Sequence, residues 1–186
     1  MTDLRVKIGS IDFKNPIFTA SGTFGYGTEV SELTDVSALG AIVTKSITLH
    51  PREGNPPPRI VETTGGMINS IGLANIGVEQ FIEEMLPVYQ SFGTAVIVNI
   101  AGSTVEEYCQ VLKKIDAVSS NIAGYEINIS CPNVKEGGMA FGVCSESTAR
   151  LTVQLRLLTE RLLILKLSPN VTDITVIGKA AQEAGA

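Results

Sequence analysis

Short apolar runs alternate with longer segments of mixed polarity along most of the chain. Each run is nearly continuous and ends at a glycine, a proline or a polar residue, which is typical of strands buried on both faces. Strands are therefore predicted at residues 16–20, 41–44, 95–100, 123–127 and 162–165. The segments between the runs have helical spacing and predict helices at residues 28–39, 78–91, 103–115, 145–160 and from 173 onward.

Several local signals refine these boundaries. Ser103 and Glu106 have the spacing of a capping box, so the third helix is expected to be capped at Ser103. Pro87 is expected to bend or restart the second helix. Residues 60–63 predict a strand on the rim of the molecule, and residues 65–73 predict a glycine-punctuated loop.

Strands that alternate with helices indicate an α/β fold with a parallel sheet, and both a doubly wound sheet and a (β/α)8 TIM barrel fit this pattern. A polar residue sits at or just past the carboxyl end of each predicted strand: Ser21, Lys45, Asn99, Asn128 and Lys166. In a barrel these ends form a ring around one cavity, where barrel enzymes carry their active sites. The GxGxxG fingerprint of dinucleotide-binding sheets is absent after the first strand. We therefore expect a TIM barrel.

The predicted elements amount to about five βα units, whereas a complete barrel has eight in roughly 250 residues. We therefore expect residues 1–186 to form one incomplete barrel domain, with an N-terminal hairpin at about residues 4–13. An incomplete barrel leaves two apolar strand edges unpaired, which exposes the sheet to aggregation. For this reason we expect the chain to be part of a longer one.

Composition narrows the class of protein. Hydrophobic residues make up 44% of the 186, which argues against disorder, and the formal net charge of −5 gives no reason to expect nucleic acid. The three cysteines form no CxxC pair, so neither a disulfide framework nor a metal site is expected. Cys109 lies on a helical apolar stripe and is expected to pack. No signal peptide or membrane span is predicted, which favours the cytoplasm.

The most distinctive stretch is Asn128-Ile129-Ser130-Cys131-Pro132-Asn133, which follows the fourth predicted strand. Proline cannot donate a ladder hydrogen bond, so the strand ends at Cys131. The amides of Asn128 and Asn133 flank the thiol and offer donors and acceptors to a planar, amide-rich ligand. Taken alone, Cys131 fits an inert packing cysteine, but its place in the ring of strand ends favours chemistry. Glu126, within the strand, is expected to make an inward structural hydrogen bond.

Five stretches together resemble the catalytic subunit of the class I, heteromeric, NAD-linked (B-type) dihydroorotate dehydrogenases. They are Thr19–Gly22, Thr44–Ser46, Asn69–Leu73, Asn128–Asn133 and Lys166–Asn170. The glycines at 137, 138 and 142 that follow the cysteine motif favour this type over the single-subunit, fumarate-linked type. The resemblance runs from the first hairpin to Ala186 and corresponds to about five of the eight strands of the family's barrel.

The resemblance implies an FMN-dependent oxidoreductase that converts dihydroorotate to orotate in de novo pyrimidine (UMP) biosynthesis. Cys131 takes the position of the general base, which removes a proton while a hydride passes to the flavin. A free thiol has a pKa near 8.5, close enough to neutrality for this role when its surroundings help. The flavin supplies the hydride chemistry, and the protein supplies position and electrostatics.

The resemblance also implies a role for each matching residue. Substrate contacts are implied for Lys45, Asn69, Ser70, Ile71, Gly72, Leu73, Asn128 and Asn133. FMN contacts are implied for Ser21, Lys45, Ser46, Asn99, Asn128 and Lys166. Lys166 would lie beside the isoalloxazine ring and stabilise the negative charge that reduction places there. The family's phosphate-binding loops follow later strands, so a chain that stopped at Ala186 would not be expected to bind FMN stably or to turn over.

The expected partner is an electron-transfer subunit that carries FAD and a 2Fe-2S cluster and passes electrons to NAD. A homodimer of catalytic subunits within a heterotetramer is expected, without nucleic acid or membrane. Two alternatives stay open on the sequence. One is a non-catalytic half-barrel fragment that only associates with other chains, and the other is a different flavin-dependent pyrimidine reductase.

Overall fold

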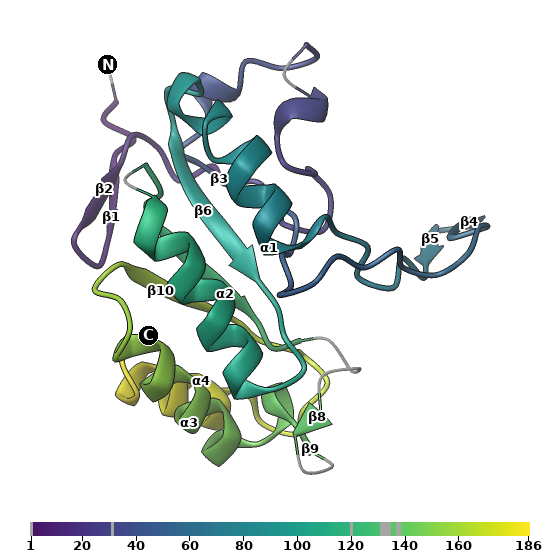
Figure 1. Ribbon diagram of the computed structural model, residues 1–186, viewed down its shortest axis with the longest axis vertical. Coiled ribbons are helices and arrows are strands. Elements are labelled where there is room, and N and C mark those ends of the chain that lie inside the picture. The colour runs from purple at the N-terminus through teal and green to yellow at the C-terminus, as the bar shows by residue number, and fades with distance from the viewer. Residues whose placement is uncertain (1, 31, 120, 131–134, 137–138) are drawn as a thin grey trace.

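The computed structural model describes residues 2–30, 32–119, 121–130, 135–136 and 139–186 (Figure 1). Its main sheet has four parallel strands. They are β3 (Ala41–Val43), β6 (Ala95–Ile100), β7 (Gly124–Asn128) and β10 (Leu162–Lys166). Their order in the sheet is also their order in the chain. A doubly wound sheet reverses its strand order at a switch point, whereas a (β/α) barrel does not.

The strand predicted at residues 16–20 is reduced to a single parallel bridge between Phe18 and Ala41. The reason is that a side chain replaces part of the backbone ladder. The hydroxyl of Thr19 accepts a hydrogen bond from the Val43 N–H at 2.8 Å and donates one to the Val43 carbonyl at 3.3 Å. This segment still lies beside β3 as the first strand of the series.

A side-chain contact between its two edges shows that the sheet is curved. Lys166, at the end of β10, donates from Nζ to the hydroxyl of Ser21, which follows the first strand, at 3.5 Å. In a flat sheet, five strands spaced by about 4.8 Å would hold these edges roughly 19 Å apart. A lysine side chain cannot span that distance. The sheet is therefore a segment of a (β/α) barrel, and the sequence-based prediction of the fold class is confirmed.

The inner face of the barrel carries a small apolar core that the N-terminal hairpin covers. The hairpin consists of β1 (Val6–Ile8) and β2 (Ile11–Phe13), as predicted. Phe13 is 1% exposed and packs with Ala41, Val43 and Ile97 on the inner face. The hairpin therefore closes the end of the barrel at which the strands begin.

The outer face of the sheet packs against helices (Figure 1). These are α1 (Gly77–Gln80), α2 (Val105–Val118) and α3 (Ser145–Arg156). A fourth helix, α4 (Ile174–Glu183), packs against α3. A π-helical turn, Phe81–Met85, continues α1, and a 3-10 turn, Val88–Ser91, restarts the chain after Pro87 as expected. Along the described ranges, no helix has both the length and the apolar character that crossing a bilayer requires.

Two helix predictions were wrong in detail. The segment at 28–39 forms two 3-10 turns, Thr28–Val30 and Val36–Ala38, and no buried residue in either turn anchors a longer helix. The cap of α2 lies one residue later than predicted, because Thr104 takes the extended conformation of an N-cap and accepts from the Glu107 N–H at 3.2 Å. Glu107 in turn accepts from the Ser103 N–H at 2.5 Å, so its carboxylate bonds to the residue before the N-cap and not to the N-cap itself.

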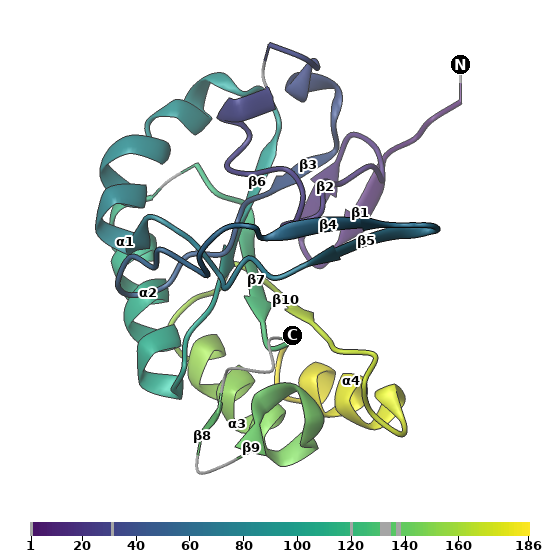
Figure 2. The same cartoon turned by 90° about the vertical axis from the view of Figure 1, so that its right-hand side faces the viewer.

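A β-hairpin projects from the barrel where part of a loop was predicted (Figures 1 and 2). It pairs β4 (Ile60–Thr63), which was predicted, with β5 (Gly66–Asn69), which lies in the predicted loop. In the register of the pair, Val61 faces Ile68 across the two strands. The glycines near the turn hid the short β5 pattern in the sequence. A second, smaller hairpin pairs β8 (Lys135–Glu136) with β9 (Met139–Ala140).

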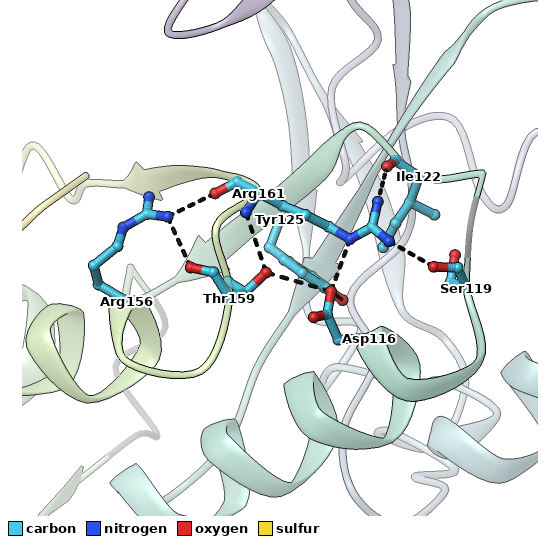
Figure 3. Close-up of polar contacts among 7 residues, drawn as sticks. All are labelled: Asp116, Ser119, Ile122, Tyr125, Arg156, Thr159 and Arg161. Carbon is cyan, nitrogen blue, oxygen red and sulfur yellow. Dashed lines mark hydrogen bonds and ion pairs between the residues drawn. The ribbon is translucent and has the colours of Figure 1, made fainter.

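A polar network stabilises the end of the sheet at which the strands begin (Figure 3). Arg161 directly precedes β10, and its guanidinium donates to Asp116 Oδ1 of α2 at 2.8 Å. It also donates to the carbonyls of Ile122 and Ser119, both at 2.6 Å. The Tyr125 hydroxyl donates to the same Asp116 oxygen at 2.9 Å. Burial, together with the Asp116 charge, raises the pKa of Tyr125, so this hydroxyl stays protonated. The network fixes α2 against the start of β7 and β10.

Candidate active site

The inner face of the sheet changes from apolar to polar along each strand. Side chains alternate between the two faces of a strand, so on β6 the inner position after Ile97 is Asn99, and on β10 the one after Ile164 is Lys166. On β7 the corresponding positions are Glu126 and Asn128, which pair with Ile164 and Lys166. A polar layer therefore lies at the carboxyl ends of the strands, above the apolar inner core.

Four of the predicted site residues are joined in two hydrogen-bonded pairs. Lys166 meets Ser21 across the mouth of the barrel, as described above. Asn128 donates from Nδ2 to the hydroxyl of Ser46 at 3.2 Å, and its Oδ1 accepts from the Ser130 hydroxyl at 2.8 Å. Ser21, Ser46 and Asn128 are buried, whereas Lys166 is exposed at the open mouth. The structure thus brings together strand ends that lie far apart in the sequence.

Asn99 is fully buried, and Glu126 makes the inward hydrogen bond that the sequence predicted. Asn99 Nδ2 donates to Glu126 Oε1 at 2.5 Å. The backbone N–H of Asn99 donates to the Thr44 hydroxyl at 3.1 Å, and that hydroxyl donates to the Lys45 carbonyl at 3.1 Å. Asn99 Oδ1 has no hydrogen-bond partner among the described residues. The site therefore holds a buried acceptor that a ligand donor could satisfy.

Lys45 follows β3 and is half-buried, two residues after the inner-face residue Val43. Its backbone N–H donates to the Gly25 carbonyl at 2.8 Å. This bond ties the end of β3 to the glycine-rich turn that follows Ser21. The two turns that carry Ser21 and Lys45 are therefore held next to each other.

The predicted substrate segment Asn69, Ser70, Ile71, Gly72 and Leu73 begins at the end of the projecting hairpin. Within the described ranges, its hydrogen bonds run to Asn55, Arg59 and Asn75 and not to the side chains at the strand ends. Gly72 has a φ of +75°, and a Cβ there would lie 2.6 Å from the backbone nitrogen of Asn55. Only glycine fits this close approach. That this segment and Asn128 contact the same substrate stays a prediction.

Asn75, which was not among the predicted site residues, is a buried amide that organises this region. Its Oδ1 accepts from the backbone N–H groups of Thr48 at 3.1 Å and Gly77 at 2.9 Å. Its Nδ2 donates to the Thr48 hydroxyl at 2.8 Å and to the Leu73 carbonyl at 2.9 Å. It thereby connects the loop after β3 to Leu73, a non-glycine residue with a φ of +58°. The available signal was an amide placed among apolar residues, in Leu73-Ala74-Asn75-Ile76.

A family model described as dihydroorotate dehydrogenase matches residues 3–186. The chain belongs to the dihydroorotate dehydrogenase family. Two similar proteins are both described as the catalytic subunit of dihydroorotate dehydrogenase B (NAD(+)). The one from Thermoanaerobacter sp. (strain X514) is 52% identical over 184 residues, and the one from Bacteroides thetaiotaomicron is 50% identical over 186 residues.

These alignments cover 99% and 100% of this chain but 60% and 61% of the two relatives, so the chain spans about 60% of their length. A crystal structure of DHODH from Eimeria tenella in complex with ferulenol has a TM-score of 0.80 and 20% identity to this chain. The alignment covers 98% of this chain and 57% of the Eimeria tenella chain. That likeness shows the fold, and it agrees with a partial dihydroorotate dehydrogenase barrel.

Two residues with roles predicted from the dihydroorotate dehydrogenase resemblance lie outside the described residues. They are Cys131, the predicted general base, and Asn133, a predicted substrate contact. Both roles stay predictions. Ser130, directly before this segment, is described and bonds to Asn128 as given above.

The other two cysteines of the chain have opposite environments. Cys109 is 7% exposed on the inner side of α2, as predicted, and burial raises the pKa of its thiol. Cys144 is half-buried directly before α3, where hydrogen bonds from the backbone and hydroxyl of Ser147 lower the pKa of its thiol. A larger thiolate fraction at Cys144 makes it the better nucleophile.

We expect iodoacetamide to alkylate Cys144 much faster than Cys109 in the folded protein near neutral pH. Peptide mapping by mass spectrometry after short labelling times measures the two rates. The same labelling in denaturant is the control, in which the two sites should react alike. Equal rates in the folded protein would show that neither environment acts as described.

Proposed function

We propose that the protein to which this chain belongs oxidises dihydroorotate to orotate in pyrimidine biosynthesis, with FMN as its cofactor. The observation that carries the proposal is the identity of about half of the residues, over 99% of the chain, to proteins described as catalytic subunits of dihydroorotate dehydrogenase B (NAD(+)). The polar layer at the strand ends supports it, because that is where barrel enzymes carry their chemistry.

The described residues fit part of a flavin site. A flavin ring offers an imide N–H between two carbonyl groups, and it needs both donors and acceptors from the protein. Asn99 Oδ1 is a buried acceptor without a partner in the described chain, while Lys166 and Ser21 are donors at the mouth of the barrel. We assign FMN contacts to the predicted set, which is Ser21, Lys45, Ser46, Asn99, Asn128 and Lys166.

Within this proposal the chain's own residues hold the substrate and move one proton. Dihydroorotate loses a proton and a hydride from adjacent carbons, and the bond between them becomes double. Cys131, as a thiolate, would take the proton. FMN, when bound, supplies the acceptor for the hydride. Substrate contacts are assigned to Lys45, Asn69, Ser70, Ile71, Gly72, Leu73, Asn128 and Asn133.

The two lysines supply positive charge on opposite sides of the mouth of the barrel. Lys45 is half-buried after β3, and Lys166 ends β10. In a site closed by ligands, each charge would act in a low dielectric and favour the carboxylate of the substrate or the negative charge left by hydride transfer. Both roles require the side chains to face the cavity, as Lys166 does toward Ser21.

The description of the relatives as NAD(+)-linked catalytic subunits supports a separate electron-transfer subunit. We assign FAD and a 2Fe-2S cluster to that subunit, which would pass the electrons to NAD. The proposed assembly is a heterotetramer built around a homodimer of catalytic subunits, in the cytoplasm. Residues 1–186 would form the larger part of the FMN-binding barrel domain.

Anaerobic titration of the whole protein tests the function. We expect a yellow protein whose flavin absorbance is bleached by dihydroorotate and not by dihydrouracil, which has the same ring without the carboxylate. Bleaching by dihydrouracil instead would indicate a different pyrimidine reductase. A colourless protein that does not take up added FMN would contradict the proposal and favour a non-catalytic assembly role.

A further inference from the structure

Asn99 and Glu126 form a directly opposed pair on the inner face of the barrel. They face each other in the register of β6 and β7, and Asn99 Nδ2 lies 2.5 Å from Glu126 Oε1. The pair lies one inner position deeper than Asn128 and Lys166, which are opposed on β7 and β10. Asn99 is 0% exposed, so solvent does not satisfy its amide.

The chemistry of the two groups fixes the orientation of the amide. An asparagine amide has a donor end and an acceptor end, whereas an ionised carboxylate can only accept. Glu126 therefore holds the NH2 end of Asn99 and turns the oxygen away. The nearby hydroxyl of Thr44 cannot serve that oxygen, because its proton is donated to the Lys45 carbonyl. Asn99 Oδ1 is consequently left as a buried acceptor without a partner among the described residues.

We propose that Glu126 is a positioning residue, which orients the Asn99 amide so that its oxygen accepts a hydrogen bond from the imide N–H of the flavin. The inference rests on the proposed function. A buried acceptor without a donor is unfavourable, and a ligand N–H at this depth removes that penalty. Lys166 and Ser21 at the mouth can donate to a ring carbonyl, so the three groups supply the acceptor and the donors that an imide edge requires.

The test compares FMN with 3-methyl-FMN, in which a methyl group replaces the imide hydrogen. Dissociation constants are measured by flavin fluorescence on the whole protein stripped of flavin. We expect the wild type to prefer FMN by about 30-fold, within the range that one unsatisfied buried acceptor produces. If the wild type binds both flavins equally while dihydroorotate still bleaches FMN, this inference is overturned and the proposed function stands.

Two variants separate hydrogen bonding from charge and from steric exclusion of the methyl group. Glu126→Gln removes the charge but keeps an acceptor oxygen, so the preference should stay within about threefold of the wild type. Glu126→Leu removes the acceptor at similar volume, so the preference should fall by about tenfold or more. An unchanged preference in Glu126→Leu, or an equal fall in both variants, would overturn the role of Glu126. A wild type that binds no flavin would defeat both proposals.

Discussion

Replacing Cys131 by alanine should lower kcat for dihydroorotate oxidation by about 10²- to 10⁴-fold, the usual contribution of a general base. The methyl group of alanine cannot take a proton, so the carbon–hydrogen bond must break without help. Flavin binding should be unchanged, because no flavin contact is assigned to this side chain. Steady-state kinetics on the flavin-loaded whole protein, with the flavin content measured by absorbance, checks both statements.

The same substitution at the two other cysteines is the matched control. Cys109→Ala and Cys144→Ala should keep the wild-type kcat, because Cys109 packs in α2 and Cys144 precedes α3. Cys131→Ser should be slow near neutral pH and recover as the pH rises, since a hydroxyl ionises far above a thiol. A Cys131→Ala protein that forms orotate at the wild-type rate would remove the thiol from the mechanism.

The strands of the main sheet could be predicted because a strand that is buried on both faces consists of consecutive apolar residues. β6 was found at its observed bounds for this reason. β10 was found within one residue from its apolar run, although Leu163 is its one buried residue. The first strand was overestimated, because Thr19 replaces part of the ladder with its own hydroxyl. The pattern of apolar residues does not show that a side-chain hydroxyl takes the place of backbone hydrogen bonds. β5 was missed because the glycines near its turn are typical of a loop, whereas the equally exposed β4 has the β-branched run that predicts a strand.

The ring of strand-end residues could be placed from the sequence, but their partners could not. The rule that parallel strands end on one rim puts Ser21 and Lys166 on the same edge. The curvature of the sheet, which the sequence does not reveal, brings Lys166 Nζ to 3.5 Å from the Ser21 hydroxyl oxygen. Asn75 was missed because its side-chain hydrogen bonds join two loops, and loop paths follow from packing and not from periodicity. The unpartnered oxygen of Asn99 is likewise visible only in three dimensions.

Arg161→Ala should destabilise the protein by about 2–4 kcal/mol, because one guanidinium serves three buried or half-buried acceptors (Figure 3). Among the described residues, its loss leaves the Asp116 carboxylate with the hydroxyls of Tyr125 and Thr159 as its remaining side-chain donors. The Ser119 and Ile122 carbonyls would lose the donor that joins α2 to β7. A lower urea midpoint of the whole protein, with an unchanged transition slope, is the expected result.

Arg5→Ala is the matched control for this prediction, because Arg5 pairs with Asp3 at the same 2.8 Å but on the surface. The side chains of Arg5 and Asp3 are 74% and 62% exposed, against 27% and 26% for Arg161 and Asp116. Water and salt screen an exposed pair, so this variant should unfold at the wild-type urea midpoint. If both variants shifted the midpoint equally, the removed charge would be responsible. If neither did, the network in Figure 3 would not stabilise the start of the sheet.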